Sequence, residues 1–171
     1  MNVNSPLQEI LDYFAEVETG FEAINAAWYS DLPPIQDVER HTETIKGVDG
    51  NDIRLYIHRP KDAAGLLPCV YHIHGGGMVI MKASNAGSTR WRDELASLCM
   101  VVVGVEFRNG AGVLGCHPFP AGLNDCQSGL EWTCENKTAM GISRIIVSGE
   151  SGGGNLALAL CLKSKKDGKL E

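Results

Sequence analysis

The sequence has no long hydrophobic run, no paired cysteine motif and few clustered basic residues. Its longest apolar stretch lies around Met100–Val105, far short of the ~20 residues that a membrane-spanning helix needs. None of the six cysteines forms a C-x-x-C pair, which disfavours a structural zinc site. Lys and Arg number 15 against 21 Asp and Glu, so the net charge is −6. This balance disfavours nucleic-acid binding, which needs clustered positive charge.

The first residues, MNVNSPLQEI, lack a basic region followed by an apolar block, so no signal peptide is predicted. The cysteines occur singly, mostly in apolar stretches, as is typical of buried thiols in a reducing compartment. We therefore expect a cytoplasmic protein without a nucleic-acid partner or a membrane span. The one basic cluster is interpreted as a solvated helix face: Lys163, Lys165, Lys166 and Lys169.

Hydrophobic periodicity then predicts the secondary structure. Apolar residues at steps of three and four predict an amphipathic helix over Ser5–Trp28, capped by Ser5 and weakened or broken at Gly20. Continuous apolar strands alternate with helices after it, which is typical of an α/β fold with a mostly parallel sheet covered on both faces. The expected elements are a hairpin of 41–46 and 53–59 turning at 48–51, strands 68–74, 100–107 and 144–148, and helices 89–98, 121–135 and 152–165.

Ser151 stands at the centre of a G-x-S-x-G pentapeptide between a predicted strand and a predicted helix. A strained strand-to-helix turn of this kind exposes the serine Oγ, and Gly149 and Gly153 flank it because larger side chains would collide. The backbone N–H of Gly152 then points to where a tetrahedral oxyanion forms, beside the positive end of a helix. The pattern predicts a serine nucleophile, although serine also commonly serves as a plain helix N-cap.

A second glycine motif, His74-Gly75-Gly76-Gly77, follows an earlier predicted strand. Glycines allow backbone N–H groups to approach a ligand closely, and an HGGG loop supplies the other oxyanion donor in lipases and esterases. Acyl transfer needs both donor elements at the carboxyl ends of strands. Together the two motifs predict an oxyanion hole.

The segments HIHGGGM, HPFPAGLNDC and GESGGGN resemble the hormone-sensitive-lipase family of α/β-hydrolases, and the resemblance extends from the first helix to the last residue. It implies hydrolysis of carboxylic esters without a cofactor or metal. By this resemblance Ser151 is the nucleophile and the amides of Gly76, Gly77 and Gly152 form the oxyanion hole, while His74 shapes the loop and is not the base.

The same resemblance implies an α/β-hydrolase fold with two parts. Residues 1–40 are expected to form an N-terminal cap helix and connector, and residues 41–171 the N-terminal part of the hydrolase core. The family's last three strands have no counterpart here, so strand 144–148 is expected to be an open sheet edge. A second copy or a C-terminal half would then cover that edge, because exposed edges promote aggregation.

The sequence departs from the family pattern at the catalytic base. In this fold the acid and the histidine follow the serine along the chain. All histidines precede Ser151 in this sequence: His41, His58, His72, His74 and His117. A serine without its base is a poor nucleophile, so we expect weak or no activity from this chain.

Other interpretations compete with catalysis. One is a non-catalytic protein that binds a small molecule in a retained oxyanion pocket. Another is nucleotide binding, because residues 152–157 match G-x-G-x-x-A, although no acidic residue on a following strand completes that motif. His72 and His74 lie two residues apart on one strand face and suggest a metal site, but no third ligand is evident nearby.

Several acidic residues are assigned structural roles. We expect Glu150 to brace the serine turn through hydrogen bonds, and Asp125 to cap a helix or form an ion pair. The adjacent Asp93 and Glu94 are interpreted as part of a solvated helix face.

Overall fold

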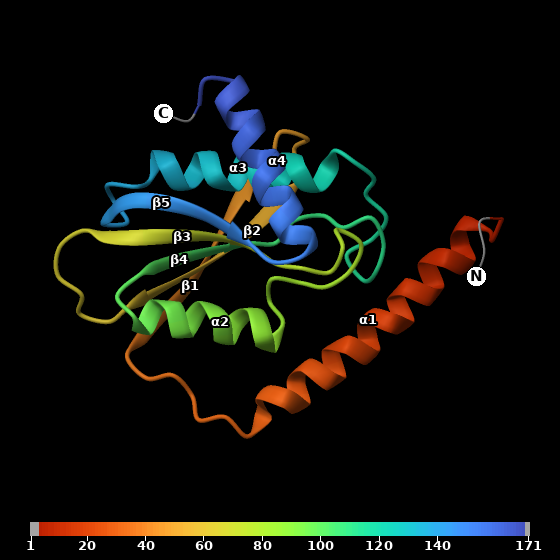
Figure 1. Ribbon diagram of the computed structural model, residues 1–171, viewed down its shortest axis with the longest axis horizontal. Coiled ribbons are helices and arrows are strands. Elements are labelled where there is room, and N and C mark those ends of the chain that lie inside the picture. Colours follow the sequence, from red (N-terminus) through yellow and green to blue (C-terminus); the bar gives the residue numbers. More distant parts are fainter. Residues whose placement is uncertain (1–3, 170–171) are drawn as a thin grey trace.

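Five strands form one sheet, in the order β1-β2-β4-β3-β5, in the computed structural model, which describes residues 4–169 (Figure 1). β1 pairs antiparallel with β2 and β2 with β4, whereas β3 runs parallel to both β4 and β5. Four of these five strands therefore run in the same direction and β2 runs in the opposite one, so the sheet is mostly parallel, as the sequence predicts. The strands are β1 (Val38–Lys46), β2 (Asp52–Pro60), β3 (Leu67–Ile73), β4 (Val101–Val105) and β5 (Ile142–Gly149); the helices are α1 (Leu7–Ser30), α2 (Ala86–Ser97), α3 (Ala121–Glu135) and α4 (Gly152–Lys166).

Helices cover both faces of the sheet. Figure 1 shows α3 and α4 on one face and α2 on the other. The larger core cluster includes residues of β2–β5, α3 and α4, with Tyr71, Val103 and Leu160 fully buried. A smaller cluster of Val70, Ala96 and Val102 lies on the α2 side. The predicted two-sided burial of β4 is confirmed, since all five of its residues are buried.

The predicted strands and helices are present, but several of their boundaries differ. β1 begins at Val38, three residues earlier than expected, and β5 covers Ile142–Gly149 and not only 144–148. The strand that leads into the HGGG motif, β3, ends at Ile73, so His74 already belongs to the loop. α2 begins three residues earlier than expected, because the Asn85 side chain accepts a hydrogen bond of 2.8 Å from the Ser88 N–H and caps it. The strand predicted over 100–107 is shorter in the structure, where β4 covers only Val101–Val105. The N-cap of α1 is Pro6 and not Ser5, and the Pro6 side chain makes no capping hydrogen bond.

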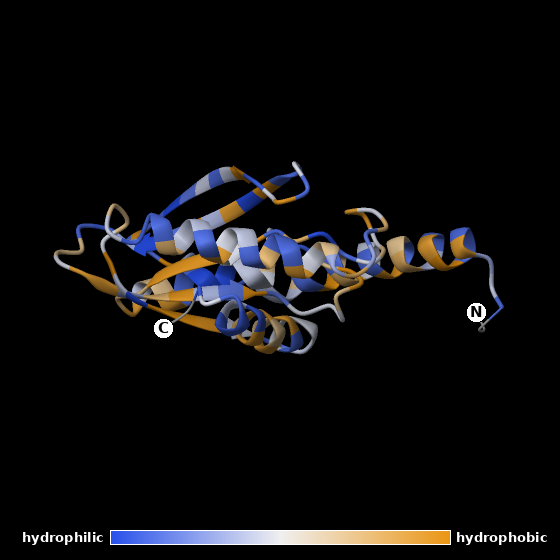
Figure 2. Cartoon of the chain, turned by 90° about the horizontal axis from the view of Figure 1, so that it is seen from above, coloured by the Kyte–Doolittle hydropathy of each residue, from blue (hydrophilic) through white to orange (hydrophobic). Residues whose placement is uncertain are grey.

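Helix α1 is continuous through Gly20 and extends beyond the sheet (Figure 2). Its attachment is polar: the two carboxylate oxygens of the fully buried Glu18 accept hydrogen bonds from the N–H groups of Met81 (2.9 Å) and Val113 (2.7 Å). Asn25 accepts a further bond of 2.6 Å from the Gly87 N–H. Part of the apolar stripe that predicts this helix remains exposed, at Leu7, Phe21, Ile24 and Trp28.

The sheet is open at β5. Among residues 4–169 no strand pairs with the outer side of β5, as the sequence predicts. Ile146 on this strand is 50% exposed, and Leu158 and Leu162 on the adjoining helix α4 are 70% and 71% exposed. Exposed apolar side chains thus occur both on this edge strand and on the helix that follows it.

The prediction that Asp93 belongs to a solvated helix face is wrong. Asp93 is buried, and Arg40 binds both of its oxygens at 2.8 and 2.6 Å. His58 Nδ1 lies 2.8 Å from the same carboxylate, and the Arg92 Nε–H donates to His58 Nε2 at 3.2 Å. Because arginine can only donate, Nε2 must be the acceptor and Nδ1 must carry the proton. Glu94, by contrast, pairs with Arg90 at the surface, as expected.

This cluster predicts a pH dependence of stability. Burial, reinforced by the Arg92 charge and opposed by Asp93, lowers the pKa of His58 from 6.5 to about 4. The unfolded chain, with an ordinary histidine pKa of about 6.5, therefore binds more protons between these values. We expect the free energy of unfolding to be highest above pH 6.5 and to fall by about 3 kcal/mol toward pH 4 through this residue alone.

Urea denaturation from pH 7 to pH 4 measures this loss. His58→Gln is the matched variant, because glutamine can donate to Asp93 and accept from Arg92 without titrating. The pH slope should be smaller in the variant than in the wild type. Equal slopes would show that His58 does not cause the acid destabilisation.

All six cysteines are free thiols, but only some of them are buried as predicted. Cys69 and Cys126 lie in the core, whereas Cys99, Cys116 and Cys134 are exposed. Of the helices formed by residues 4–169, none combines the length and the apolar character required to cross a membrane.

Candidate active site

Ser151 occupies a strained turn between β5 and α4. Its backbone has φ 52° and ψ −121°, a region that a residue with a side chain rarely adopts. Although Ser151 is the N-cap residue of α4, its side chain makes no capping hydrogen bond and is exposed. The interpretation of Ser151 as a plain helix cap is therefore wrong.

The glycines on either side of the serine permit this turn. A Cβ at Gly149 would overlap backbone atoms of Gly153, and a Cβ at Gly153 would overlap the carbonyl oxygens of Ile73 and His74. The first turn of α4 thus packs closely against the end of β3. The sequence predicts this close packing through the G-x-S-x-G pattern.

The HGGG loop lies directly against the start of α4. A Cβ at Gly152 would be 2.8 Å from the backbone nitrogens of Gly77 and Met78. Gly76 has φ 102°, which favours glycine, and a Cβ there would overlap the Ile80 carbonyl oxygen. None of the hydrogen bonds within residues 4–169 uses the N–H of Gly76, Gly77 or Gly152. The fold therefore brings three available amide donors into one neighbourhood beside Ser151.

Glu150 links the serine turn to the HGGG loop. Its Oε1 accepts a hydrogen bond of 2.9 Å from the Gly75 N–H, and its Oε2 lies 2.9 Å from His72 Nε2. Burial acts to raise the pKa of Glu150, but the hydrogen bonds from His72 and Gly75 outweigh it, and the net effect lowers the pKa. The carboxylate stays charged and holds both segments, as expected for a bracing residue.

His74 is buried within the loop. Its Nδ1 lies 2.7 Å from the Gly75 carbonyl oxygen, and its ring stacks on Phe107 with centroids 4.3 Å apart. Burial lowers the pKa of His74, which favours a neutral ring. Nε2 is 4.0 Å from Glu106. His72 and His74 thus have different partners, and no group of three potential metal ligands exists in the part of the chain that the structure describes.

No histidine within residues 4–169 pairs with Ser151 as a catalytic base would. His41 pairs with Glu43, His58 with Asp93, His72 with Glu150 and His74 with Gly75, while His117 contacts the Leu114 carbonyl oxygen. The site can present a hydroxyl next to amide donors that polarise a carbonyl. Each histidine among residues 4–169 has another partner, so this part of the chain supplies no histidine base to remove the hydroxyl proton.

The remaining predicted residues lie away from Ser151. Asp125 forms an ion pair with Arg108 at 2.8 Å and accepts a hydrogen bond from Asn51, which confirms the prediction that it pairs. Cys116 and His117 lie in the loop between β4 and α3. Sequence reasoning missed Glu18 and the partnership of His72 with Glu150, because both depend on contacts between distant segments.

Comparison with known proteins places the fold in a family. Residues 70–171 match a family described as having the alpha/beta hydrolase fold. Carboxylesterase NlhH of Mycobacterium tuberculosis is 28% identical over 167 residues, which cover 93% of this chain and 51% of the relative. Tuliposide A-converting enzyme 1 of Tulipa gesneriana is 26% identical over 148 residues, covering 78% of this chain and 37% of the relative.

The solved structures most similar to this chain that we compare are also esterases. Brefeldin A esterase, described as a bacterial homologue of human hormone-sensitive lipase, matches with a TM-score of 0.92 and 42% identity over 99% of this chain and 47% of its own. Esterase Est22 matches with a TM-score of 0.85 and 36% identity over 95% of this chain and 51% of its own. The chain therefore spans about half the length of these relatives.

Proposed function

Since the chain belongs to the α/β-hydrolase family, we propose that it is a serine carboxylesterase that cleaves carboxylic esters through an acyl-enzyme. The observation that carries this proposal is the contact between the HGGG loop and the first turn of α4, with the strained Ser151 exposed beside it. The cofactor-free chemistry of an esterase fits this arrangement of a hydroxyl and backbone amides.

In the proposed mechanism Ser151 Oγ attacks the ester carbonyl carbon. The carbonyl oxygen becomes an oxyanion held by the N–H groups of Gly76, Gly77 and Gly152. The oxyanion collapses, the ester C–O bond breaks, and the alcohol leaves with the proton that the Ser151 hydroxyl gives up. Water then hydrolyses the acyl-enzyme, which releases the acid and restores the Ser151 hydroxyl. One such amide donor is typically worth about 10²–10³ in turnover, and Glu150 keeps the donors in place through Gly75.

We propose that this chain alone is weakly active or inactive, because Ser151 has no base among the described residues. An oxyanion site without a triad still accelerates the reaction over water, but far less than the complete machinery. The same observation favours a second candidate function, a non-catalytic protein that binds a small molecule in the oxyanion pocket.

The domain assignment, the covering partner and the location are also proposals. Residues 1–40 would form the cap helix and connector, and residues 41–171 the hydrolase core. The exposed Ile146, Leu158 and Leu162 support a cover for the β5 edge, either a second copy or a C-terminal hydrolase half. The free state of all six cysteines supports a reducing compartment such as the cytoplasm.

Labelling with a fluorophosphonate, together with turnover of p-nitrophenyl acetate, tests the function. We expect slow labelling at Ser151, none in Ser151→Ala, and unchanged labelling in Ser97→Ala, which removes an exposed hydroxyl from α2. Turnover should be at least about 10³-fold below that of a full-length relative.

Each other outcome contradicts one of the proposals. Turnover close to that of a relative and lost in Ser151→Ala would show that the chain is a complete catalyst. Labelling accompanied by measurable turnover would rule out the non-catalytic function. Absence of labelling at Ser151, or tight binding of NAD, would contradict the esterase.

A further inference from the structure

Glu18 of α1 binds two loops beside the candidate active site. Its side chain is fully buried; Oε1 accepts a hydrogen bond of 2.9 Å from the Met81 N–H, and Oε2 accepts one of 2.7 Å from the Val113 N–H. Met81 belongs to the loop that continues from the HGGG motif, and Val113 to the loop between β4 and α3. Burying a carboxylate is costly, so an apolar side chain would attach α1 more easily. Glu18 therefore indicates a need for two acceptors at this position.

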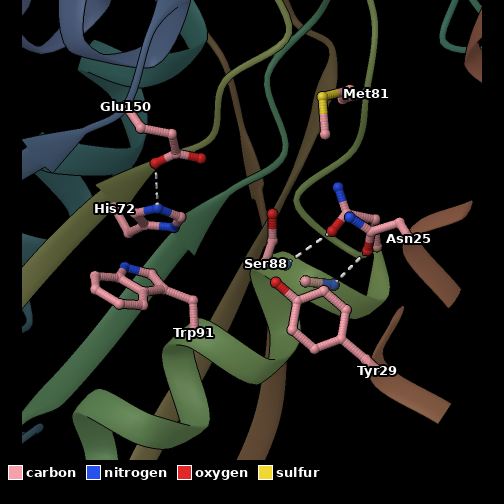
Figure 3. Close-up of a pocket in the computed structure, with 9 residues that line it drawn as sticks. Asn25, Tyr29, His72, Met81, Ser88, Trp91 and Glu150 are labelled. Carbon is pink, nitrogen blue, oxygen red and sulfur yellow. Dashed lines mark hydrogen bonds and ion pairs between the residues drawn. The ribbon is translucent and has the colours of Figure 1, made fainter. Parts of the chain in front are cut away.

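The backbone of Met81 is strained. Its φ of 79° lies in the left-handed region, which a residue with a side chain rarely adopts. Glu18 accepts from the Met81 N–H, and the side chain of Asn109, also fully buried, donates to the Met81 carbonyl oxygen at 2.6 Å. The Met81 side chain lines a pocket of about 350 Å³ between α1, α2 and the end of β3 (Figure 3), so close packing does not hold it on that side. Hydrogen bonds with two buried side chains therefore fix this conformation.

The peptide group held by Glu18 also touches Gly76. A Cβ at Gly76 would lie 2.1 Å from the Ile80 carbonyl oxygen, which belongs to the same peptide group as the Met81 N–H. The Gly76 carbonyl oxygen in turn accepts hydrogen bonds from the N–H groups of Val79 (3.0 Å) and Ile80 (3.1 Å), which closes this segment into a turn. A shift of the peptide group would therefore displace the HGGG loop and the amide donors that it carries.

The second loop supports the same turn from another side. The N–H groups of residues 110 and 111 donate to the carbonyl oxygens of residues 78 and 79, both at 2.9 Å. Glu18 adds a third connection between the two loops through Val113. Gly112 has φ 75°, and a Cβ there would lie 2.1 Å from Glu18 Oε2, so the loop approaches this carboxylate as closely as glycine allows.

We propose that Glu18 is a positioning residue for the oxyanion hole. By accepting from Met81 and Val113 at once, it fixes the peptide group before Met81 and thereby the N–H groups of Gly76 and Gly77. This inference rests on the proposed function, since those donors are needed only by a reaction that forms an oxyanion. Helix α1 then supports the catalytic site itself, in addition to any role as a cap.

Glu18→Met tests this role, because methionine is similar in length and offers no acceptor oxygen. We expect the maximal rate of Ser151 labelling by a fluorophosphonate to fall at least about tenfold, with the half-saturating concentration unchanged. Glu18→Gln restores one acceptor and should react at an intermediate rate. An unfolded fraction would lower the amount of protein labelled and not the rate, so the rate separates positioning from stability.

Amide NMR spectra of the unlabelled protein measure the position of the loop directly. The signals of Gly76 and Gly77 should shift in Glu18→Met. The signal of Gly152, the donor that belongs to α4, should stay in place. A general loosening of the protein would move all three signals.

Glu22→Gln is the matched control on the same helix. It weakens the ion pair of 2.6 Å between α1 and the Lys82 side chain, but it leaves the acceptor of the Met81 N–H intact. Because a partly exposed ion pair contributes little, labelling should stay within about twofold of the wild-type rate. The glycine signals should not move.

Several results would overturn the role of Glu18. These are a wild-type labelling rate in Glu18→Met, unmoved signals of Gly76 and Gly77, or an equal loss in Glu22→Gln. If Glu18→Met does not fold, a wild-type rate in Glu18→Gln would show that two acceptors are not needed. Absence of Ser151 labelling in the wild type contradicts the esterase, whereas unmoved glycine signals contradict the positioning, so the two failures are distinguishable.

Discussion

Gly153→Ala is expected to lower the free energy of unfolding by about 3 kcal/mol or more. The new methyl group would overlap the carbonyl oxygens of Ile73 and His74, which are backbone atoms that cannot rotate away. Relief requires α4 to separate from the end of β3. That movement would also withdraw the Gly152 N–H from Gly77, so labelling of Ser151 should fall together with stability.

Two other glycines provide matched controls for this substitution, measured by urea denaturation at pH 7. Gly154→Ala places its methyl 3.1 Å from the Gly149 carbonyl oxygen, while the change favours the helix, so the net effect should stay within about 1 kcal/mol. Gly20→Ala in α1 meets nothing within 4 Å and should raise stability by about 0.5–1 kcal/mol. A loss at Gly153 no larger than that at Gly154 would contradict the close packing of the serine turn.

Asp93→Ala is expected to cost about 3–5 kcal/mol of unfolding free energy. The substitution leaves the His58 Nδ1–H without an acceptor and removes one of the negative charges near Arg92, which is 1% exposed. Arg40 is half exposed and can return to water. The cluster ties α2 to β1 and β2, so its loss should also weaken the attachment of that helix.

Glu94, the next residue in the chain, provides the control for Asp93→Ala. Within residues 4–169 the Glu94 side chain pairs only with Arg90, at the surface, so Glu94→Ala should change stability by at most about 1 kcal/mol. Asp93→Asn keeps the shape and removes the charge, which separates the ionic contribution from the packing. Similar losses in Asp93→Ala and Glu94→Ala, compared by thermal and urea denaturation, would contradict the buried network.

The sequence predicts the structural features that are determined by residues close together in the chain. The serine turn is one example, because Gly149 and Gly153 flank Ser151 within five residues and their packing leaves no room for side chains. The apolar run of β4 is another, since all its residues are buried. The HGGG loop could be recognised for the same reason.

The features that the sequence does not predict depend on residues far apart in the chain. Asp93 and Glu94 look alike in the sequence, and only the contacts with Arg40 and His58 distinguish them. One signal was available: Gly104 interrupts the valines of β4, and a Cβ there would be 2.9 Å from Arg92. A glycine in a buried strand indicates close approach by another group. No comparable signal marks the contacts of Glu18 with two loops.

The pairing of β3 with β5 has a consequence for the order of folding. It joins segments whose registered residues, such as Val70 and Ile146, are separated by 76 positions. Closing so long a loop is slow, and no local intermediate can replace it. The amides of Gly76 and Gly77 can therefore meet Ser151 only after the chain has collapsed across most of its length. Native-state hydrogen exchange at the fully buried Tyr71, which lies between β4 and β5, should then report opening of the whole sheet and not local fraying.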